Sequence, residues 1–195
     1  MKTAILIRHS KRDKIKNPKN HKEVLLNEEG KKIARNFGKE LAIRFDSVKI
    51  FSSPVERCIQ TGKCICEAFS KKTEIETSSM LGEPGPFVYG DAWESFEKLG
   101  TTGVVESLEK GIELPLIHSE AYGTKTLLDF IRTETCKCSE NTAAVFVTHD
   151  ACVAPVINFF TGEYFEKSHW IEFIGGLEIQ FDEKSVYIKR LNGVE

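Results

Sequence analysis

Residues 5–12 read Ile-Leu-Ile-Arg-His-Ser-Lys-Arg, an apolar run that ends in a histidine flanked by arginines. Ala4–Ile7 is short and bounded by polar residues, which is typical of a central parallel strand covered on both faces. In open α/β sheets, ligands bind just beyond the carboxyl ends of such strands, where Arg8, His9 and Arg12 fall. Taken alone, the octapeptide favours a solvated arginine and a hydrogen-bonded polar histidine, so the rest of the sequence has to decide whether this is a site.

The chain is long enough for one well-filled hydrophobic core and short for two. It has 195 residues, of which 41% are hydrophobic, and we expect a single domain over residues 1–195. The formal net charge of -2 hides an uneven distribution, because residues 1–22 hold eight Lys or Arg and one acid, Asp13. Such a basic segment attracts an anionic ligand or, alternatively, binds nucleic acid.

The cysteines and the apolar runs indicate the environment of the protein. Six cysteines are too few for a disulfide scaffold, and the pairs Cys64/Cys66 and Cys136/Cys138 lack the C-x-x-C spacing of a zinc knuckle. The N-terminal apolar run is too short for a signal peptide, and no later stretch approaches the length of a membrane span. We therefore expect a cytoplasmic protein with reduced thiols, no bound metal and no membrane partner.

Two further predicted strands end in residues of the same chemical type. Val48–Phe51 is a short strand, and Ser52-Ser53-Pro54 then supplies a hydroxyl cap and an early proline for a helix with Arg57 in its first turn. Ala143–Val147 is the most strand-like run of the chain and ends in Thr148-His149-Asp150. Because helix N-termini favour anions and ligands bind at strand ends, we expect these residues to converge with His9 on one mouth.

The remaining pattern predicts a layered α/β fold. Asn27 is a helix cap followed by apolar residues at fourfold spacing, and the Gly- and Pro-rich stretch 80–90 predicts a loop that can present Glu83 to the site. We expect a three-layer sandwich with a mostly parallel central sheet, helices on both faces and a C-terminal β-hairpin at one edge. Its other predicted elements are an edge strand at 74–77, one or two helices within 91–111 broken near 100–103, helices from 119 or 124 to 132 and over 151–160, and hairpin strands at 177–181 and 186–188.

Four sequence motifs in this order together resemble the histidine phosphatase superfamily, which includes phosphoglycerate mutases and histidine acid phosphatases. They are Arg8-His9 after a strand, Leu26-x-x-x-Gly30, Ser52-Ser53-Pro54-x-x-Arg57-x-x-Gln60-Thr61, and His149-Asp150 before an apolar helix. The resemblance implies a phosphoglycerate mutase-like α/β fold and a reaction through a phosphohistidine. Arg12 and Asp150 are similar to residues of the acid-phosphatase branch, whereas the Glu83 loop and the small size resemble the mutase-like branch.

One departure from the family pattern is Ser10, where glycine is usual. The backbone carbonyl of Ser10 can still hold His9 in the tautomer that the reaction needs. We therefore expect the reaction to survive, as long as the backbone at Ser10 does not require a conformation that glycine alone adopts.

The residue types suit the transfer of a phosphoryl group. A phosphate monoester is dianionic and resists a negative nucleophile, whereas a neutral imidazole has a lone pair and no repelling charge. His9 is therefore the predicted nucleophile. Arg8, Arg12 and Arg57 are predicted to bind the phosphoryl oxygens through their planar donor groups, with His149 as a further donor.

The leaving alkoxide also needs a proton. A carboxyl group can supply it when burial or nearby carboxylates raise its pKa, and the predicted donor is Asp150, with Glu83 as the second choice. The same carboxylate then acts as a base while water hydrolyses the phosphohistidine. The sequence thus predicts a phosphomonoester hydrolase that acts on a small phosphorylated substrate and needs neither a metal nor another cofactor.

Three other functions fit parts of the same pattern. A phosphoglycerate mutase-like phosphotransferase would keep its phosphohistidine from water and hold a second substrate phosphate. A non-catalytic module would bind a phosphorylated ligand without turnover, and a nucleic-acid-binding protein would use the basic segment. The substrate depends on the loops 11–22 and 80–111, in which Phe87, Tyr89 and Trp93 either line a pocket or pack the loop down. Neither the substrate nor the oligomeric state follows from the sequence.

Overall fold

The computed structural model of the chain describes residues 1–15, 22–71, 73–182 and 185–194. Half of the predicted loop 11–22 falls on residues 16–21, and the predicted hairpin turn includes residues 183–184. These two segments therefore lie outside the described residues, and the structure decides nothing about their part in substrate binding or in the hairpin.

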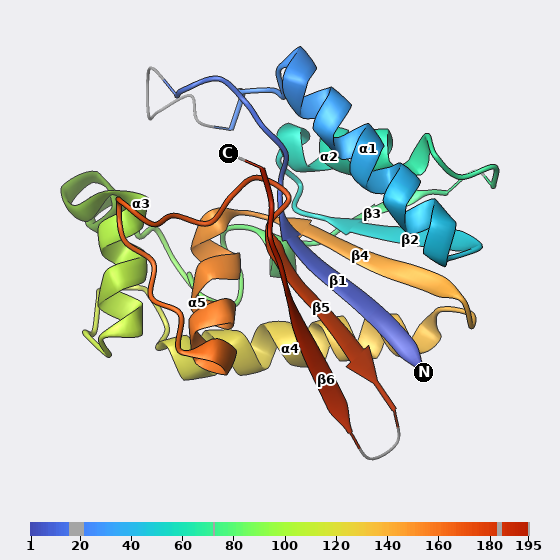
Figure 1. The fold of residues 1–195 in the computed structure, drawn as a ribbon. Coiled ribbons are helices and arrows are strands. Elements are labelled where there is room, and N and C mark those ends of the chain that lie inside the picture. Colours follow the sequence, from blue (N-terminus) through green and yellow to red (C-terminus); the bar gives the residue numbers. More distant parts are fainter. Residues whose placement is uncertain (16–21, 72, 183–184, 195) are drawn as a thin grey trace.

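Within the described residues, a six-stranded sheet forms the centre of the fold (Figure 1). Along the sheet, the first four strands run parallel to one another, and β5 runs antiparallel to both of its neighbours, β1 and β6. The strand order is β3 (Ile75–Thr77), β2 (Ser47–Ser52), β4 (Thr142–Thr148), β1 (Lys2–Arg8), β5 (Gly176–Phe181) and β6 (Val186–Leu191). β1 and β4 lie side by side in the middle and are buried on both faces, which explains their continuous apolar runs. The predicted mostly parallel sheet with a C-terminal hairpin at one edge is confirmed.

Helices cover both faces of this sheet (Figure 1). Side chains of β1 alternate between the faces, so that Ile5 and Ile7 belong to one hydrophobic cluster and Ala4 and Leu6 to the other. The first cluster includes residues of α1 (Glu28–Arg44) and α2 (Glu56–Cys66), and the second includes residues of α3 (Trp93–Glu109), α4 (Glu120–Lys137) and α5 (Asp150–Thr161). The predicted three-layer sandwich is therefore confirmed.

Two of the predicted helix starts are confirmed, and one is wrong. The Asn27 side chain accepts a hydrogen bond from the Gly30 N–H at the start of α1, and Ser119 caps α4 in the same way. α2 begins at Glu56 without a side-chain cap, later than Ser53 and Pro54 predicted. Val55 is the N-cap residue, and the Ser53 hydroxyl accepts from the Val55 N–H at 3.4 Å and also makes a tertiary contact that is described below.

The predicted break in the helix after residue 91 is confirmed at Gly100. Gly100 has φ +67° and ψ 172° within α3, a backbone conformation that residues with a side chain rarely adopt. After the break, Val104, Val105 and Leu108 are buried in the core, whereas before it Ser95 is the one buried residue among 93–99. The break therefore separates a segment that packs into the core from a more exposed segment that begins at Trp93.

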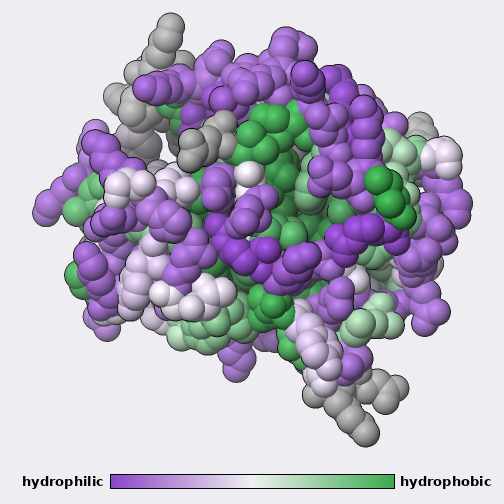
Figure 2. Space-filling view, viewed as in Figure 1, coloured by the Kyte–Doolittle hydropathy of each residue, from purple (hydrophilic) through white to green (hydrophobic). Residues whose placement is uncertain are grey.

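Most of the surface in view is hydrophilic, and hydrophobic side chains show in smaller patches between polar ones (Figure 2). This agrees with a composition in which 29% of residues are charged. Of the helices that the structure describes, none combines the length and the apolar character needed to cross a membrane.

Glu109 links α3 to the segment after α5 and makes stability depend on pH. Its carboxylate accepts hydrogen bonds from the Phe165 N–H at 3.2 and 3.3 Å, and burial raises the pKa of Glu109 to about 7. Between the ordinary carboxyl pKa and about 7, the folded protein binds a proton that the unfolded chain releases. Stability is therefore highest at acid pH and falls as the pH rises through this range. Because Glu109 is partly exposed, solvent screening limits the loss to about 1 kcal/mol.

We expect Glu109→Gln to remove this dependence, because the amide oxygen still accepts from Phe165 and carries no charge. The measurement is the free energy of unfolding by urea at pH 5 and pH 8. Glu113→Gln, an exposed change in the loop after α3, is the matched control and should behave like the wild type. An equal loss of stability in wild type and Glu109→Gln would contradict the assignment.

Candidate active site

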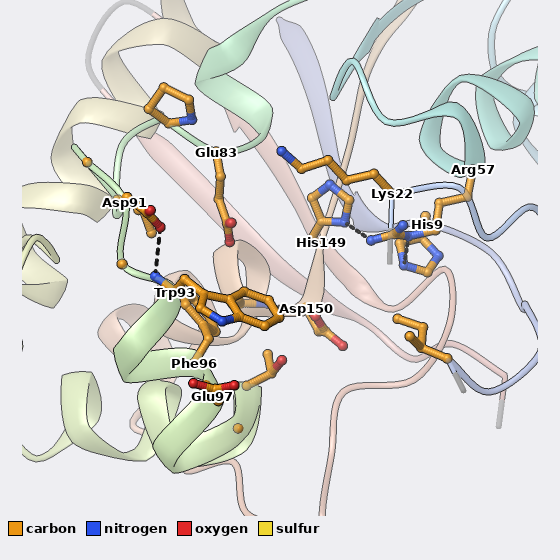
Figure 3. Close-up of a pocket in the computed structure, with 18 of the residues that line it drawn as sticks. His9, Lys22, Arg57, Glu83, Asp91, Trp93, Phe96, Glu97, His149 and Asp150 are labelled. Atoms are coloured by element: carbon orange, nitrogen blue, oxygen red, sulfur yellow. Dashed lines mark hydrogen bonds between the residues drawn. The ribbon is translucent and has the colours of Figure 1, made fainter. Parts of the chain in front are cut away.

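The carboxyl ends of three neighbouring strands bring the predicted site residues together. His9 follows β1, His149 follows β4, and Arg57 lies in the first turn of α2, which follows β2. Arg57 contacts both imidazoles, with Nε 3.0 Å from His9 Nε2 and an Nη2 atom 3.1 Å from His149 Nδ1 (Figure 3). The guanidinium therefore bridges two rings whose centres lie 5.6 Å apart.

The hydrogen bonds of His9 define where its proton lies. His9 Nδ1 is 2.8 Å from the Ser10 carbonyl oxygen, which can only accept, so Nδ1 carries the proton. Nε2 accepts from Arg57 and therefore has the lone pair. Burial lowers the pKa of His9 well below its ordinary value, and the nearby His149, Arg57 and Arg8 lower it further. The ring is thus neutral, with a nucleophilic nitrogen between cations.

Ser10 fits the position where the family pattern has glycine. Positive φ at described non-glycine residues is confined to Leu116, Asn141 and Ile174, so Ser10 does not need a glycine-only conformation. Its N–H donates to Thr61 Oγ1 at 3.0 Å, and its hydroxyl donates to the Gly30 carbonyl at 2.7 Å. The serine therefore adds a contact that holds the loop after β1, and the backbone at Ser10 does not require a conformation that glycine alone adopts.

Gly30 is needed because α1 begins directly against this loop. A Cβ atom at residue 30 would lie 1.9 Å from the Lys11 carbonyl oxygen, a distance that no packing permits. We expect Gly30→Ala to lower the free energy of unfolding by about 2 kcal/mol through this clash. We also expect slower turnover, since the displaced loop carries the Ser10 carbonyl. Urea denaturation and steady-state kinetics test both effects. A more stable Gly30→Ala protein, the usual result within a helix, would contradict the close contact.

Asp150 is held by Arg8 and by the segment after α5. Its Oδ2 atom is 3.0 Å from Arg8 Nη2 and accepts from Trp170 Nε1 at 3.2 Å. The Arg8 guanidinium also lies 4.1 Å above the centre of the Phe173 ring. Burial acts to raise the pKa of Asp150, but Arg8, His9 and the Trp170 hydrogen bond outweigh it and hold the pKa well below its ordinary value. Asp150 is therefore an ionised carboxylate that fixes Arg8.

Two arginines of the segment that contains His9 have unused donors; Arg12 lines the cavity described below, and Arg8 does not. Among the residues that the structure describes, the Nε atoms of Arg8 and Arg12 are buried without a hydrogen-bond partner. Burial lowers the pKa of Arg12, and the charge of Arg57 lowers it further. Burial also lowers the pKa of Arg57. Arginine nevertheless stays protonated, so an anion with several oxygens would satisfy donors and charge together.

Glu83 reaches the cavity from a loop that is fastened to the strand ends. The short 3₁₀ helix η2 (Ser79–Leu81) precedes it, and the Leu81 carbonyl accepts a hydrogen bond from Thr148 Oγ1 at 2.7 Å. The Ser78 N–H donates to the Ser52 carbonyl at 2.9 Å. Glu83 itself is exposed, lines the cavity, and extends toward Asp150 and His149 (Figure 3).

Several contacts of the site have no signal in the sequence. His149 Nδ1 accepts from Arg57, so its Nε2 carries the proton and donates to Ser53 Oγ at 2.9 Å. The sequence assigned Ser53 to a helix cap instead. Trp170 and Phe173 come from an irregular segment some 160 residues after Arg8, and nothing in its local pattern indicates a contact with the site.

A cavity of about 830 Å³ opens beside these residues. His9, Arg12, Arg57 and His149 line it, and so do Tyr89 and Trp93. Phe87 does not line it, because this side chain is 3% exposed and packs in the core. Within the described residues, no group of three or more His, Cys, Asp or Glu side chains is arranged to hold a metal ion.

Comparison with known proteins identifies the same architecture elsewhere. A family model of the histidine phosphatase superfamily (branch 1) matches residues 4–94, and no curated protein sequence matches the chain. A phosphoserine phosphatase from Entamoeba histolytica, solved with 3-phosphoglyceric acid, is 20% identical with a TM-score of 0.64, covering 100% of this chain and 98% of that chain. A mycobacterial glucosyl-3-phosphoglycerate phosphatase is 13% identical with a TM-score of 0.67 and full coverage of both chains, 100% and 100%. A phosphoglycerate mutase from Bacillus anthracis is 16% identical with a TM-score of 0.64, covering 97% of this chain and 92% of that chain.

At these identities the solved structures show a shared fold, whereas the family match rests on sequence. The matched range contains Arg8-His9, Gly30 and Arg57. His149 lies beyond it and is brought to the same site by β4. Over residues 4–94 the chain is similar to the histidine phosphatase superfamily (branch 1).

Proposed function

We propose that the protein is a phosphatase that hydrolyses phosphate monoesters through a covalent phosphohistidine on His9. The observation that carries this proposal is the lone pair on His9 Nε2, which faces Arg57 at one end of a cavity. Burial keeps the imidazole neutral, with its pKa well below the ordinary value. A neutral nitrogen beside fixed cations is suited to attack a dianionic phosphoryl group.

The first step forms the bond between His9 Nε2 and phosphorus while the bond to the ester oxygen breaks. Arg8, Arg12 and Arg57 bind the phosphoryl oxygens as charge spreads over them. The proton on His9 Nδ1 stays on that nitrogen, hydrogen-bonded to the Ser10 carbonyl, so attack through Nε2 gives an Nε2-phosphorylated imidazolium whose positive charge is balanced by the phosphoryl oxygens. His149 accepts a hydrogen bond from Arg57 and thereby helps to hold the guanidinium in place.

The ester oxygen that leaves takes a proton from a carboxyl group, and we assign this role to Glu83. The sequence placed Asp150 first, but Asp150 is ionised and held by Arg8 and Trp170. A carboxylate with a lowered pKa is a poor acid. Glu83 lines the cavity and extends into it (Figure 3). In the second step, water attacks phosphorus, gives its proton to Glu83, and releases phosphate and free His9.

The cavity favours hydrolysis over the two nearest alternatives. A mutase needs a second phosphate site, but the cavity wall that begins at Asp91 also carries Glu97 and no lining cation. A module that only binds a phosphorylated ligand does not require a nucleophilic His9 Nε2 whose ring carries its proton on Nδ1. Of the three functions, transfer of the phosphoryl group to water therefore requires the fewest structural features beyond those described.

The experiment that tests the proposal is trapping of the phosphoenzyme. The protein is mixed with a phosphate monoester labelled in its phosphoryl group and quenched within milliseconds in alkaline detergent, where phosphohistidine is stable. We expect a label that acid releases and that maps to the peptide containing His9. Turnover without such a label would overturn the covalent mechanism, and tight binding without turnover would identify a binding module.

Substrates with different leaving groups distinguish the role of Glu83 from that of Asp150. We expect Glu83→Gln to slow the hydrolysis of ethyl phosphate by about 100-fold and that of 4-nitrophenyl phosphate far less, because nitrophenolate leaves without a proton. Asp150→Asn is expected to lower kcat/KM for both substrates equally, because Arg8 loses its ion pair and is held less firmly. Comparison of kcat/KM for the two esters measures the difference. The reverse pattern would return the acid role to Asp150.

A further inference from the structure

The wall of the cavity opposite His9 has a chemical character of its own. Trp93 and Phe96 lie on the first two turns of α3, and Asp91 and Glu97 lie beside them, across the cavity from His9 (Figure 3). We call these four residues the α3 wall. Trp93 and Phe96 are half-buried, so each still exposes part of its ring to the cavity.

The α3 wall is fixed in place by contacts at both ends. Asp91 Oδ1 accepts a hydrogen bond from the Trp93 N–H at 3.2 Å, which sets the start of the helix. Phe96 packs against the hydrophobic cluster that includes Val104. The break at Gly100, which also lines the cavity, ends the wall. A ligand thus meets preformed aromatic surface, which lowers the entropic cost of binding.

Charge divides the cavity into two ends. The lining cations that the structure describes are Arg12, Lys22 and Arg57, and all of them come from the loop after β1 or from α2. The α3 wall contributes the carboxylates of Asp91 and Glu97 and no cation. A substrate that matches this field is negative at its phosphate and neutral or positive at its other end.

Resting on the proposed function, we propose that the α3 wall selects phosphate monoesters whose alcohol part carries an aromatic ring, and that it favours an ammonium group over a carboxylate beyond that ring. The ring would pack on Trp93 and Phe96, where stacking adds to the burial of apolar area. An ammonium group would meet Asp91 and Glu97, whereas a carboxylate would be repelled by both. A cavity of about 830 Å³ has room for such an alcohol.

The test uses three aryl phosphates with nearly the same phenol as leaving group. They are O-phosphotyramine, 4-ethylphenyl phosphate and 3-(4-phosphonooxyphenyl)propanoate, whose far ends are positive, neutral and negative. We expect kcat/KM to fall in that order, with about a tenfold difference between the first and the last, since both wall carboxylates are exposed to screening solvent. Equal values, or a preference for the carboxylate, would overturn the charge preference.

Variants assign the preference to the α3 wall. Asp91→Asn combined with Glu97→Gln should make the three values nearly equal, because the amide at 91 still accepts from Trp93. Glu94→Gln, on an exposed residue of the same helix that does not line the cavity, should leave the order unchanged. A double variant that keeps the wild-type order would place the discrimination elsewhere.

The aromatic part is tested with 2-phenylethyl and ethyl phosphate, which both lose an alkoxide. We expect Trp93→Ala to lower kcat/KM for the phenylethyl ester about tenfold more than for the ethyl ester. Trp93→Leu, which keeps apolar volume, guards against a folding defect and should fall between. An equal loss on both esters would overturn the aromatic selection. If wild-type protein hydrolyses none of these esters and forms no phosphoenzyme, the proposed function itself fails.

Discussion

Replacing His9 with alanine is expected to lower kcat/KM for any phosphate monoester by at least about 10,000-fold, because it removes the nitrogen proposed to attack phosphorus. Phosphoenzyme trapping should detect no acid-labile label. Inorganic phosphate should still compete for binding, since Arg8, Arg12 and Arg57 remain. The variant thereby separates the nucleophile from the binding site.

The matched control is His169→Ala, which removes an exposed imidazole that pairs with Glu163 away from the cavity. This variant should keep the label and the turnover of the wild type. Loss of activity without loss of the label in His9→Ala would show that another residue is phosphorylated. Residual turnover within tenfold of the wild type would show that water attacks the ester directly.

The second large effect is expected for Arg57→Ala, with kcat/KM lower by about 1,000-fold. Arg57 contacts His9 Nε2 and His149 Nδ1 at once, so its loss removes the bridge between the two rings together with a cation proposed to bind the phosphoryl oxygens. Arg57→Lys should recover less than tenfold of this loss, because an ammonium group cannot bond to two separate acceptors in the geometry of a planar guanidinium.

Arg57→Ala also shifts the dependence on pH in a known direction. Burial lowers the pKa of His9 first, and the nearby His149, Arg57 and Arg8 lower it further. Removing one cation lets this pKa rise, and attack needs the neutral ring, so activity is lost at a higher pH as the solution is acidified. The rate of phosphoenzyme formation against pH, with one substrate for both proteins, measures the shift. Lys63→Ala, an exposed change on the same helix, should leave the profile in place.

Much of the fold follows from local patterns in the sequence. The buried strands β1 and β4 are continuous apolar runs. Asn27 and Ser119 are recognisable as helix caps because their side chains accept hydrogen bonds, and Gly100 marks the helix break because glycine adopts positive φ. The start of α2 does not follow from the sequence. The Ser53 side chain does not cap this helix, and its hydroxyl contacts His149. Local propensity cannot anticipate a partner 96 residues away.

The sequence predicts which residues meet at the strand ends but not all of the contacts that these residues make. Strand ends in a parallel sheet bring His9, Arg57 and His149 together, so their convergence can be expected from the order of motifs. The contacts of Asp150 could not be expected, because its carboxylate is held by Arg8 and by Trp170, which reaches it from the C-terminal segment. Pairing distances of this kind are set by tertiary packing and leave no trace in the local pattern.

The break at Gly100 has a consequence for how this scaffold can diverge. Residues after the break anchor α3 in the core, whereas Trp93, Phe96 and Glu97 before it line the cavity and Ser95 is the one buried residue of that segment. Mutations in the leading segment therefore change substrate preference at little cost to folding, and the two halves of one helix evolve under separate constraints. A library confined to residues 93–99 would reshape selectivity while preserving the expression and solubility of the parent.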